Sequence, residues 1–142
     1  MAGTRRRGRE AALQILYQMD TTGVPAEQAA GLFWEHLAPG DGGLDEDGRA
    51  FANELALGIG REGEKIDAAI RDASEHWRLE RMPRVDRNVL RVATYEILFV
   101  PSIPRRVTIN EAIELAKRYG DAGSPAFVNG VLDRIATVAG KD

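Results

Sequence analysis

The start of the chain carries a cluster of side chains suited to binding anions. It consists of four arginines that precede the first carboxylate of the sequence: Arg5, Arg6, Arg7 and Arg9. A guanidinium group donates hydrogen bonds in a planar fork that matches phosphate oxygens, and its flat face stacks on aromatic rings. The cluster therefore predicts either an arm that reaches an anionic ligand or a solvated start to the first helix.

The charge of the chain is unevenly distributed. Its 142 residues include 19 basic and 22 acidic ones, which gives a net charge of −3. Without the four opening arginines, 15 basic and 22 acidic residues remain, and the net charge of this remainder is −7. A basic start on an acidic body favours an electrostatic contact localised at one end of the chain.

Two glycine-rich stretches resemble ligand loops, but each lacks a necessary feature. Residues 58–63 have the glycine spacing of a dinucleotide-binding turn, which requires a preceding strand, whereas the preceding pattern here is helical. Residues 43–54 resemble a calcium loop in which Gly43 stands where the first carboxylate ligand belongs. We interpret the first stretch as the end of a helix and the second as an acidic loop before a helix.

No combination of residues in the sequence predicts catalysis, a metal site or a cofactor. The chain contains no cysteine, so thiolate ligands and disulfides are excluded. His36 and His76 have no companion at a ligand spacing, and Ser124 lies outside any nucleophile-elbow motif. We therefore predict a protein that is not an enzyme and that needs no metal or cofactor.

Apolar residues at helical spacing run through almost the whole chain, and no segment alternates as a half-buried strand would. The pattern predicts an all-α protein of about seven helices. Residues 85–100 are apolar around most of the helix circumference, which predicts a buried central helix. Thr108 and Glu111 have the spacing of a capping box, and Ser124 opens the last helix.

The length of the chain favours one domain spanning residues 1–142, with residues 1–9 as a basic arm. The longest apolar runs fall short of the roughly 18 residues that a membrane span requires. Polar residues interrupt the pattern that follows the basic start, so a secretory signal is not predicted. A cytoplasmic protein is expected.

Four segments of the sequence closely resemble the NusB family of bacterial transcription antitermination factors. In chain order they are RRRGREAALQILYQ (5–18), VDRNVLRVATYEIL (85–98), VTINEAIELAKRYG (107–120) and SPAFVNGVLD (124–133). Residues 22–62 resemble the family only in their helical layout. The resemblance implies an all-helical fold of two small packed bundles with no catalytic activity.

The resemblance also implies partners. NusB-like proteins pair with NusE, the ribosomal protein S ten of the small subunit, and the pair binds the boxA element of ribosomal and phage leader RNA. The complex helps RNA polymerase to pass terminators and supports ribosomal RNA synthesis. By the same resemblance, the opening arginines Arg5, Arg6, Arg7 and Arg9 are expected to contact single-stranded RNA.

Further RNA contacts are expected on two helices. Gln14 and Tyr17 follow the arginines, and the Tyr17 ring either stacks on a base or serves as a core or rim aromatic residue. Ser124 and Phe127 match family positions near the RNA, with a plain core role as the alternative for Phe127. The family commonly has an acidic residue where this chain has Gly123, and Asp121 is the nearest substitute.

For the protein partner, the resemblance points to the start of the central helix. Asp86 matches an acidic family position that pairs with a basic residue of NusE, and a favourable contact with the helix dipole is its alternative role. Arg87 and Arg91, on the polar side of that helix, are possible further contacts. The acidic body suits a basic ribosomal partner.

Three other functions compete with the RNA-binding adaptor. Similar helical domains occur fused to ribosomal RNA cytosine methyltransferases, where they hold RNA, but this chain shows no methyl-donor domain. A DNA-binding regulator would need a recognition helix rich in exposed Arg, Asn or Gln, and none of the predicted helices has one. A helical scaffold without nucleic acid would not need the arginines.

Overall fold

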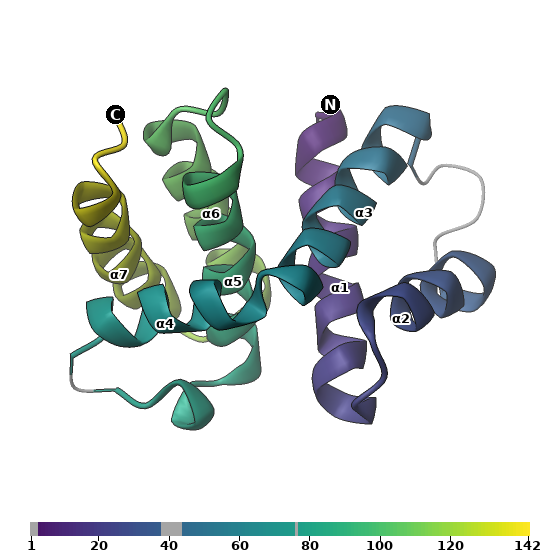
Figure 1. Cartoon of the computed structure of the whole chain (residues 1–142), viewed down its shortest axis with the longest axis horizontal. Helices are drawn as coiled ribbons and strands as arrows, with labels where there is room; N and C mark the ends of the chain where they lie inside the picture. Colours follow the sequence, from purple (N-terminus) through teal and green to yellow (C-terminus); the bar gives the residue numbers. More distant parts are fainter. Residues whose placement is uncertain (1–2, 38–43, 76) are drawn as a thin grey trace. The chain divides into compact units, whose positions relative to one another are not determined.

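The computed structural model describes residues 3–37, 44–75 and 77–142. Within these residues the chain is all-α, as predicted, with seven α-helices and no strand (Figure 1). The helices are α1 (Thr4–Thr22), α2 (Ala26–Leu32), α3 (Glu46–Arg61), α4 (Gly63–Ala73), α5 (Arg84–Phe99), α6 (Arg105–Tyr119) and α7 (Ser124–Ala139). A π-helical turn, Phe33–Leu37, follows α2, and a 3-10 turn, Leu79–Arg81, precedes α5. None of the described helices is long and apolar enough to cross a membrane.

The helices form two compact units, Met1–Arg61 and Glu62–Asp142, which we call the N-terminal unit and the C-terminal unit. In the N-terminal unit α1 packs along α3, and α2 contacts both helices. Helix α1 is capped at its C-terminal end by Gly23, whose positive φ of 77° lets its N–H bond the Met19 carbonyl at 2.8 Å.

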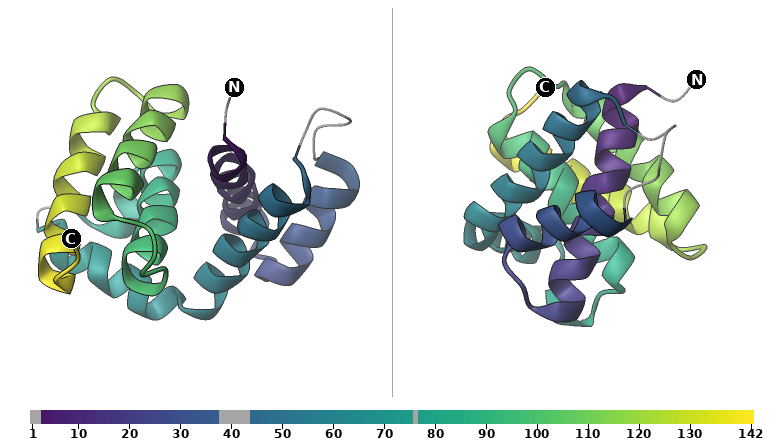
Figure 2. Two further views of the ribbon diagram at one scale, coloured as in Figure 1. Left: turned by 90° about the horizontal axis from the view of Figure 1, so that it is seen from above. Right: turned by 90° about the vertical axis from the view of Figure 1, so that its right-hand side faces the viewer.

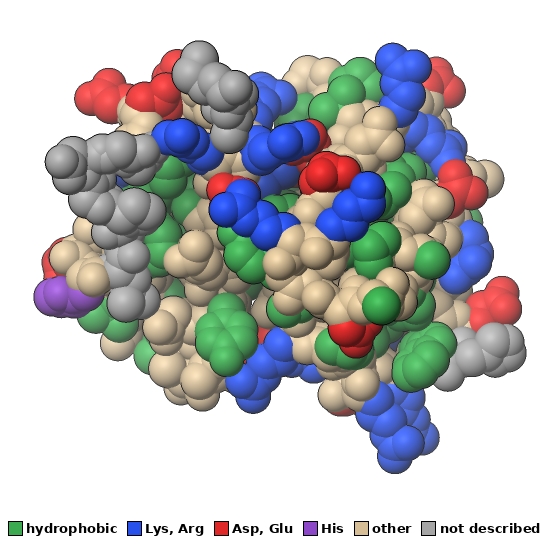
Figure 3. All heavy atoms as spheres, turned by 180° about the vertical axis from the view of Figure 1, so that it is seen from behind, with side chains coloured by type: hydrophobic (Ala, Val, Ile, Leu, Met, Phe, Trp, Pro, Cys, Tyr) green, Lys and Arg blue, Asp and Glu red, His purple; other side chains and the backbone are tan. Residues whose placement is uncertain are grey.

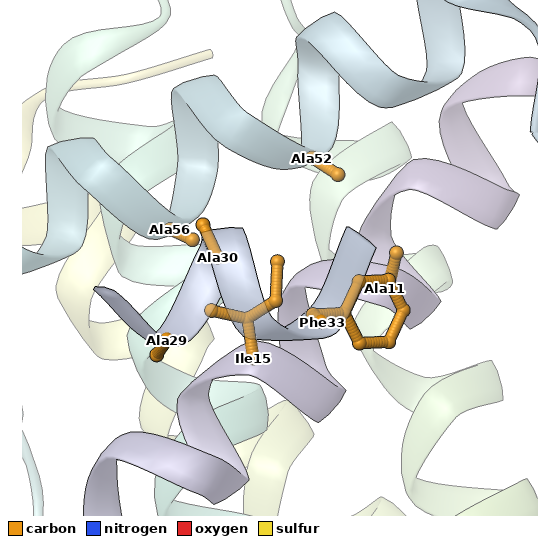
Figure 4. Packing of buried hydrophobic residues seen from close by; sticks show 7 residues of the cluster. All are labelled: Ala11, Ile15, Ala29, Ala30, Phe33, Ala52 and Ala56. Carbon is orange, nitrogen blue, oxygen red and sulfur yellow. The ribbon is translucent and has the colours of Figure 1, made fainter. Parts of the chain in front are cut away.

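One core cluster of the N-terminal unit is built mostly from small side chains. Figure 4 shows these side chains converging from α1, α2, α3 and the π-helical turn. They are Ala11, Ile15, Ala29, Ala30, Phe33, Ala52 and Ala56. Because five of these seven residues are alanines, the helix backbones approach closely, and the Phe33 ring fills the remaining space. Beside them Trp34 is half-buried and donates its indole N–H to Asn53 Oδ1 at 2.8 Å.

The C-terminal unit is organised around α5. Ten of the sixteen residues of this helix are buried, which confirms the prediction of a central helix. Helices α5, α6 and α7 lie side by side and α4 runs across α5 and α7, as the views in Figures 1 and 2 show. Helix α5 ends at Phe99, before Pro101, because proline cannot continue a helix.

The predicted capping box of the next helix is wrong. Helix α6 begins at Arg105, one turn earlier, with Pro104 as its N-cap residue. Thr108 is therefore inside the helix, where it is 1% exposed and donates its hydroxyl to Glu96 Oε1 at 2.8 Å. A buried carboxylate of α5 that needs a donor outweighs the local capping preference of a threonine.

The two glycine-rich stretches form no ligand loop in the described residues. Gly58 and Gly60 lie within α3 and Gly63 opens α4, so no strand precedes them. Residue 43 lies outside the described residues, but α3 already begins at Glu46, which leaves no room for a calcium loop over 43–54. His36 is exposed beside Glu35 in the π-helical turn, and His76 lies outside the described residues.

Candidate nucleic-acid interface

The opening arginines lie in the first turns of α1 and do not form an arm ahead of the fold. Helix α1 begins at Thr4, and the Arg7 N–H already bonds the Gly3 carbonyl at 3.1 Å. Arg5, Arg6 and Arg7 are exposed, whereas Arg9 is only 4% exposed. The expectation of an arm over residues 1–9 is corrected in this respect, because packing against α3 extends the helix to Thr4.

The start of α1 is fastened to the start of α3 by a hydrogen bond and a close helix contact. Thr4 Oγ1 donates to Asp45 Oδ2 at 3.1 Å, while Asp45 Oδ1 accepts the Gly48 N–H at 2.8 Å and so caps α3. A Cβ atom at Gly8 would lie 3.0 Å from the Gly48 carbonyl oxygen and 3.0 Å from Phe51 Cδ2. Glycine at position 8 therefore allows the two helices to touch backbone to backbone.

Two of the four arginines stack on an aromatic ring of α3. The guanidinium carbons of Arg5 and Arg9 lie 5.0 and 5.4 Å from the centre of the Phe51 ring. Both distances are within the range of about 6 Å over which a cation is attracted to a ring face. Arg5 and Arg9 thus belong to the packed side of α1.

The outward side of α1 carries the other predicted RNA contacts. At about 100° per residue, positions 6, 7, 14 and 17 fall on the side opposite the core positions. Their side chains are all exposed, and we call them the α1 face: Arg6, Arg7, Gln14 and Tyr17. Tyr17 is 50% exposed, which excludes the core alternative and leaves base stacking and a rim position open. Glu10, half-buried, lies between these residues.

The C-terminal unit contains a pocket of about 330 Å³ that includes several other predicted residues. Its walls include Trp77, Met82, Pro83, Asp86, Asp121 and Phe127. The rings of Trp77 and Phe127 meet edge to face, with centres 5.8 Å apart. In the sequence Trp77 continues the helical spacing of Ile70 and Ala73, but α4 ends at Ala73 and the indole is 56% exposed. Phe127 is half-buried at the pocket wall, so it is not a plain core residue.

A buried hydroxyl joins two carboxylates behind this pocket. Ser124 Oγ lies 2.6 Å from Asp86 Oδ1 and 3.2 Å from Asp121 Oδ1, and it accepts the Asp121 N–H at 3.1 Å. Because a hydroxyl has one proton, the short contact identifies Asp86 as the main acceptor. Burial raises the pKa of Asp86, the hydrogen bond from Ser124 lowers it, and the nearby Asp121 carboxylate raises it further. The pKa lies above its ordinary value on balance.

Asp121, the nearest substitute for the acidic residue that the family commonly has at position 123, lies in the turn before α7. Asp121 Oδ1 accepts the Gly123 N–H at 3.0 Å, and the Asp121 side chain also forms part of the pocket wall. Ser124 is 1% exposed, so its predicted contact with RNA does not run through an open hydroxyl. Its hydroxyl instead holds Asp86 and Asp121 in place.

The two residues predicted to bind the protein partner are both engaged within the C-terminal unit. Asp86 is 5% exposed and bonded to Ser124, which differs from the expected ion pair on an exposed rim. The Arg91 guanidinium forms a fork on Asp67, with Nε 2.9 Å from Oδ1 and Nη2 3.2 Å from Oδ2. Arg91 Nη1 also donates to Asn88 Oδ1 at 3.1 Å. These contacts show a structural role, while the partner role stays a prediction.

Charged side chains of both signs share the surface. On the face drawn in Figure 3, lysines and arginines are interspersed with aspartates and glutamates and do not gather into a single basic field. Charges of both signs are therefore mixed on this face, and the chain as a whole carries a net charge of −3.

An all-α chain of two small units, with a basic and aromatic helix face and an aromatic pocket, belongs to the class of binding proteins. Comparison with known proteins identifies the family. The model of the NusB family matches residues 6–137, and the chain belongs to the NusB family. This membership confirms the prediction of a non-enzymatic protein.

The relatives named transcription antitermination protein NusB match almost end to end. That of Sorangium cellulosum is 50% identical over 139 residues, covering 98% of this chain and 96% of the relative. That of Myxococcus xanthus is 45% identical, with 98% and 99% covered.

Solved structures agree with the sequence comparisons. T. maritima NusB is 44% identical, has a TM-score of 0.83, and the match covers 96% of this chain and 93% of that one. A chain from a complex of antitermination factors NusB and NusE with double-stranded RNA is 27% identical and has a TM-score of 0.81. The match covers 97% of this chain and 99% of that one.

Proposed function

We propose that this protein is an RNA-binding adaptor that pairs with NusE and binds boxA RNA to promote transcription antitermination and ribosomal RNA synthesis. In this role it joins the antitermination complex of RNA polymerase in the cytoplasm. The observation that carries the proposal is the α1 face, which presents two guanidinium groups, an amide and a phenol ring from one helix. A related chain from a NusB–NusE complex with RNA shares the fold.

The α1 face has the chemistry that single-stranded RNA requires. Guanidinium groups at positions 6 and 7 bind phosphate oxygens in a bidentate manner. The half-exposed ring of Tyr17 offers a stacking surface, and a stacked base contributes about 1–3 kcal/mol in general. Gln14 lies between them and supplies both a donor and an acceptor for a base edge.

The pocket of the C-terminal unit is suited to an unpaired base. Trp77 and Phe127 provide aromatic surface, and a flat heterocycle stacks favourably on such rings. Asp86 and Asp121 offer only acceptors when ionised, so they favour a base edge that presents amino or imino donors. Ser124 contributes by holding these carboxylates, in place of contacting the RNA itself.

Pairing with NusE fits the charge of the remainder of the chain. Outside the opening arginines the net charge is −7, and negative surface speeds association with a basic ribosomal protein. Asp86 and Arg91 remain the proposed partner contacts, reached after rearrangement of their internal bonds.

The test is a fluorescence anisotropy titration of labelled boxA RNA and of a scrambled RNA of equal length, with and without NusE, at two salt concentrations. We expect boxA to bind more tightly, NusE to strengthen this binding, and higher salt to weaken it. Equal weak binding of both RNAs, unaffected by NusE, would overturn the proposal and favour a helical scaffold that shares only the fold.

A further inference from the structure

Phe51 occupies a special position between the two helices that begin the N-terminal unit. Its side chain, on α3, is 7% exposed and lies beneath the guanidinium groups of Arg5 and Arg9. Arg5 and Arg9 are one helical turn apart, so a single ring meets both side chains on one side of α1. An apolar residue without a ring would fill the same space but offer no face to a cation.

The surroundings of the ring keep it in this place. Phe51 Cδ2 lies 3.0 Å from the point that a Cβ atom at Gly8 would occupy, so the ring is packed directly against the α1 backbone. The hydrogen bond from Thr4 to Asp45 ties the same two helices one turn earlier. Since both sides of the contact are fixed, the stacked arginines fix the rotation of the first turns of α1 about the helix axis.

The rotation of α1 matters for RNA because Arg6 and Arg7 point away from this packed side. Long flexible side chains and a fraying helix start lose freedom when they bind, and this ordering opposes binding. We propose that Phe51 is a positioning residue for RNA binding, which stacks Arg5 and Arg9 on α3 and thereby holds Arg6 and Arg7 in their binding orientation. The inference rests on the proposed function and adds to it a residue outside the RNA contacts.

The experiment compares three variants with the full-length wild-type protein. Phe51→Leu removes the ring face and keeps apolar bulk, and Phe51→Tyr keeps the ring. Phe33→Leu is the matched control, because it makes the same change in the core of the same unit, where the ring packs on Trp34. The readouts are boxA RNA affinity by anisotropy, thermal unfolding, and NMR ring-current shifts of the Arg5 and Arg9 side chains.

We expect Phe51→Leu to abolish the ring-current shifts and to weaken RNA binding about three- to tenfold. The Phe51→Tyr variant should retain the ring-current shifts, and its affinity for boxA RNA should stay within about twofold of the wild-type value. Phe33→Leu should lower the melting temperature, as any large-to-small core change does, and leave RNA affinity unchanged.

A fourth variant tests the stacking without changing the core. Arg5→Lys combined with Arg9→Lys keeps the net charge but removes the planar groups that stack on the ring. We expect a loss of RNA affinity similar to that of Phe51→Leu. Combining all three substitutions should add little further loss, since both routes break one interaction.

The outcomes separate this inference from the proposed function. If wild type binds boxA RNA and Phe51→Leu binds as well as Phe33→Leu does, Phe51 is only a core residue and the positioning role is wrong. Full affinity of the double lysine variant would overturn the role in the same way. If wild type itself does not bind RNA, the proposed function fails first, and the stacking seen by NMR serves the fold alone.

Discussion

The α1 face and the pocket of the C-terminal unit, the two candidate binding surfaces, are built in opposite ways. The α1 face is a row of exposed side chains on one helix, and their polar ends reach solvent. The pocket depends on hydrogen-bonded polar groups from three elements: the buried Asp86 of α5 and Ser124 of α7, and the exposed Asp121 of the turn between α6 and α7. The first surface is separable from the stability of the fold, whereas the second is part of what holds the C-terminal unit together.

This difference predicts opposite responses to substitution. Changes on the α1 face should affect binding and leave the free energy of unfolding almost unaltered. Changes behind the pocket should lower the free energy of unfolding before they reveal anything about a ligand. Three variants test this contrast, and a fourth, at Arg91, tests the partner contact.

The largest effect on stability is expected from Ser124→Ala. Without the hydroxyl, the Asp86 carboxylate stays buried and loses its 2.6 Å donor. We expect the free energy of unfolding to fall by about 2–3 kcal/mol, measured by urea denaturation. The control Ser102→Ala, at an exposed position, should change it by less than about 0.5 kcal/mol. Equal results for the two variants would refute the structural role of the hydroxyl.

The next effect concerns binding alone. Arg6→Ala combined with Arg7→Ala should weaken boxA RNA about tenfold or more and reduce the slope of log K against log salt by about 1.4, or roughly 0.7 per lost phosphate contact. The free energy of unfolding should change by less than about 1 kcal/mol. Arg71→Ala with Arg106→Ala, two exposed arginines elsewhere, removes the same charge. An identical loss in this control would mean that only total charge matters.

A smaller effect separates the two roles considered for Arg91. Arg91→Met keeps the apolar stem but removes the fork on Asp67, whose side chain is 22% exposed. We expect the free energy of unfolding to fall by about 1 kcal/mol, and NusE affinity to fall by more than this change in stability explains, because Arg91 is also a proposed partner contact. A NusE affinity within about twofold of wild type would leave Arg91 with the structural role alone.

The smallest effect is a dependence of stability on pH. Burial raises the folded-state pKa of Asp86 above 3.8, so the folded protein holds this proton more tightly than the unfolded chain does. The Asp86 contribution to stability must therefore fall as pH rises from 3.8 through the raised pKa. The substitution Asp86→Asn removes the titrating carboxyl group and with it this dependence on pH. Denaturation between pH 4 and 7 should show wild type losing stability relative to Asp86→Asn as pH rises, and the opposite trend would contradict the assignment.

Most of the α1 face could be predicted from sequence, because helix periodicity alone decides which positions share a side. Gln14 and Tyr17 lie outward with Arg6 and Arg7 for this reason. The position of Arg9 could not be predicted, since it depends on Gly8 and Phe51 approaching each other across 43 positions of sequence. Local charge alone does not reveal a stacking partner on another helix.

The pocket was much less predictable. The bond between Asp86 and Ser124 joins residues 38 positions apart, and Thr108 similarly bonds a carboxylate of another helix. In both cases a buried tertiary contact decided the role of a side chain that local rules treated as a cap or a surface charge. Trp77 followed the helical spacing of α4 in the sequence, yet the helix had ended four residues earlier.

The chain contains two tryptophans, and the structure places one in each unit. Trp34 is half-buried, bonded to Asn53 and covered by the Arg49 guanidinium at 4.7 Å, whereas Trp77 is largely exposed at the pocket. The two indoles therefore act as independent fluorescent reporters with different emission maxima. With Trp77→Phe the emission follows the unfolding of the N-terminal unit, and with Trp34→Phe it follows the C-terminal unit and quenching by a ligand in the pocket.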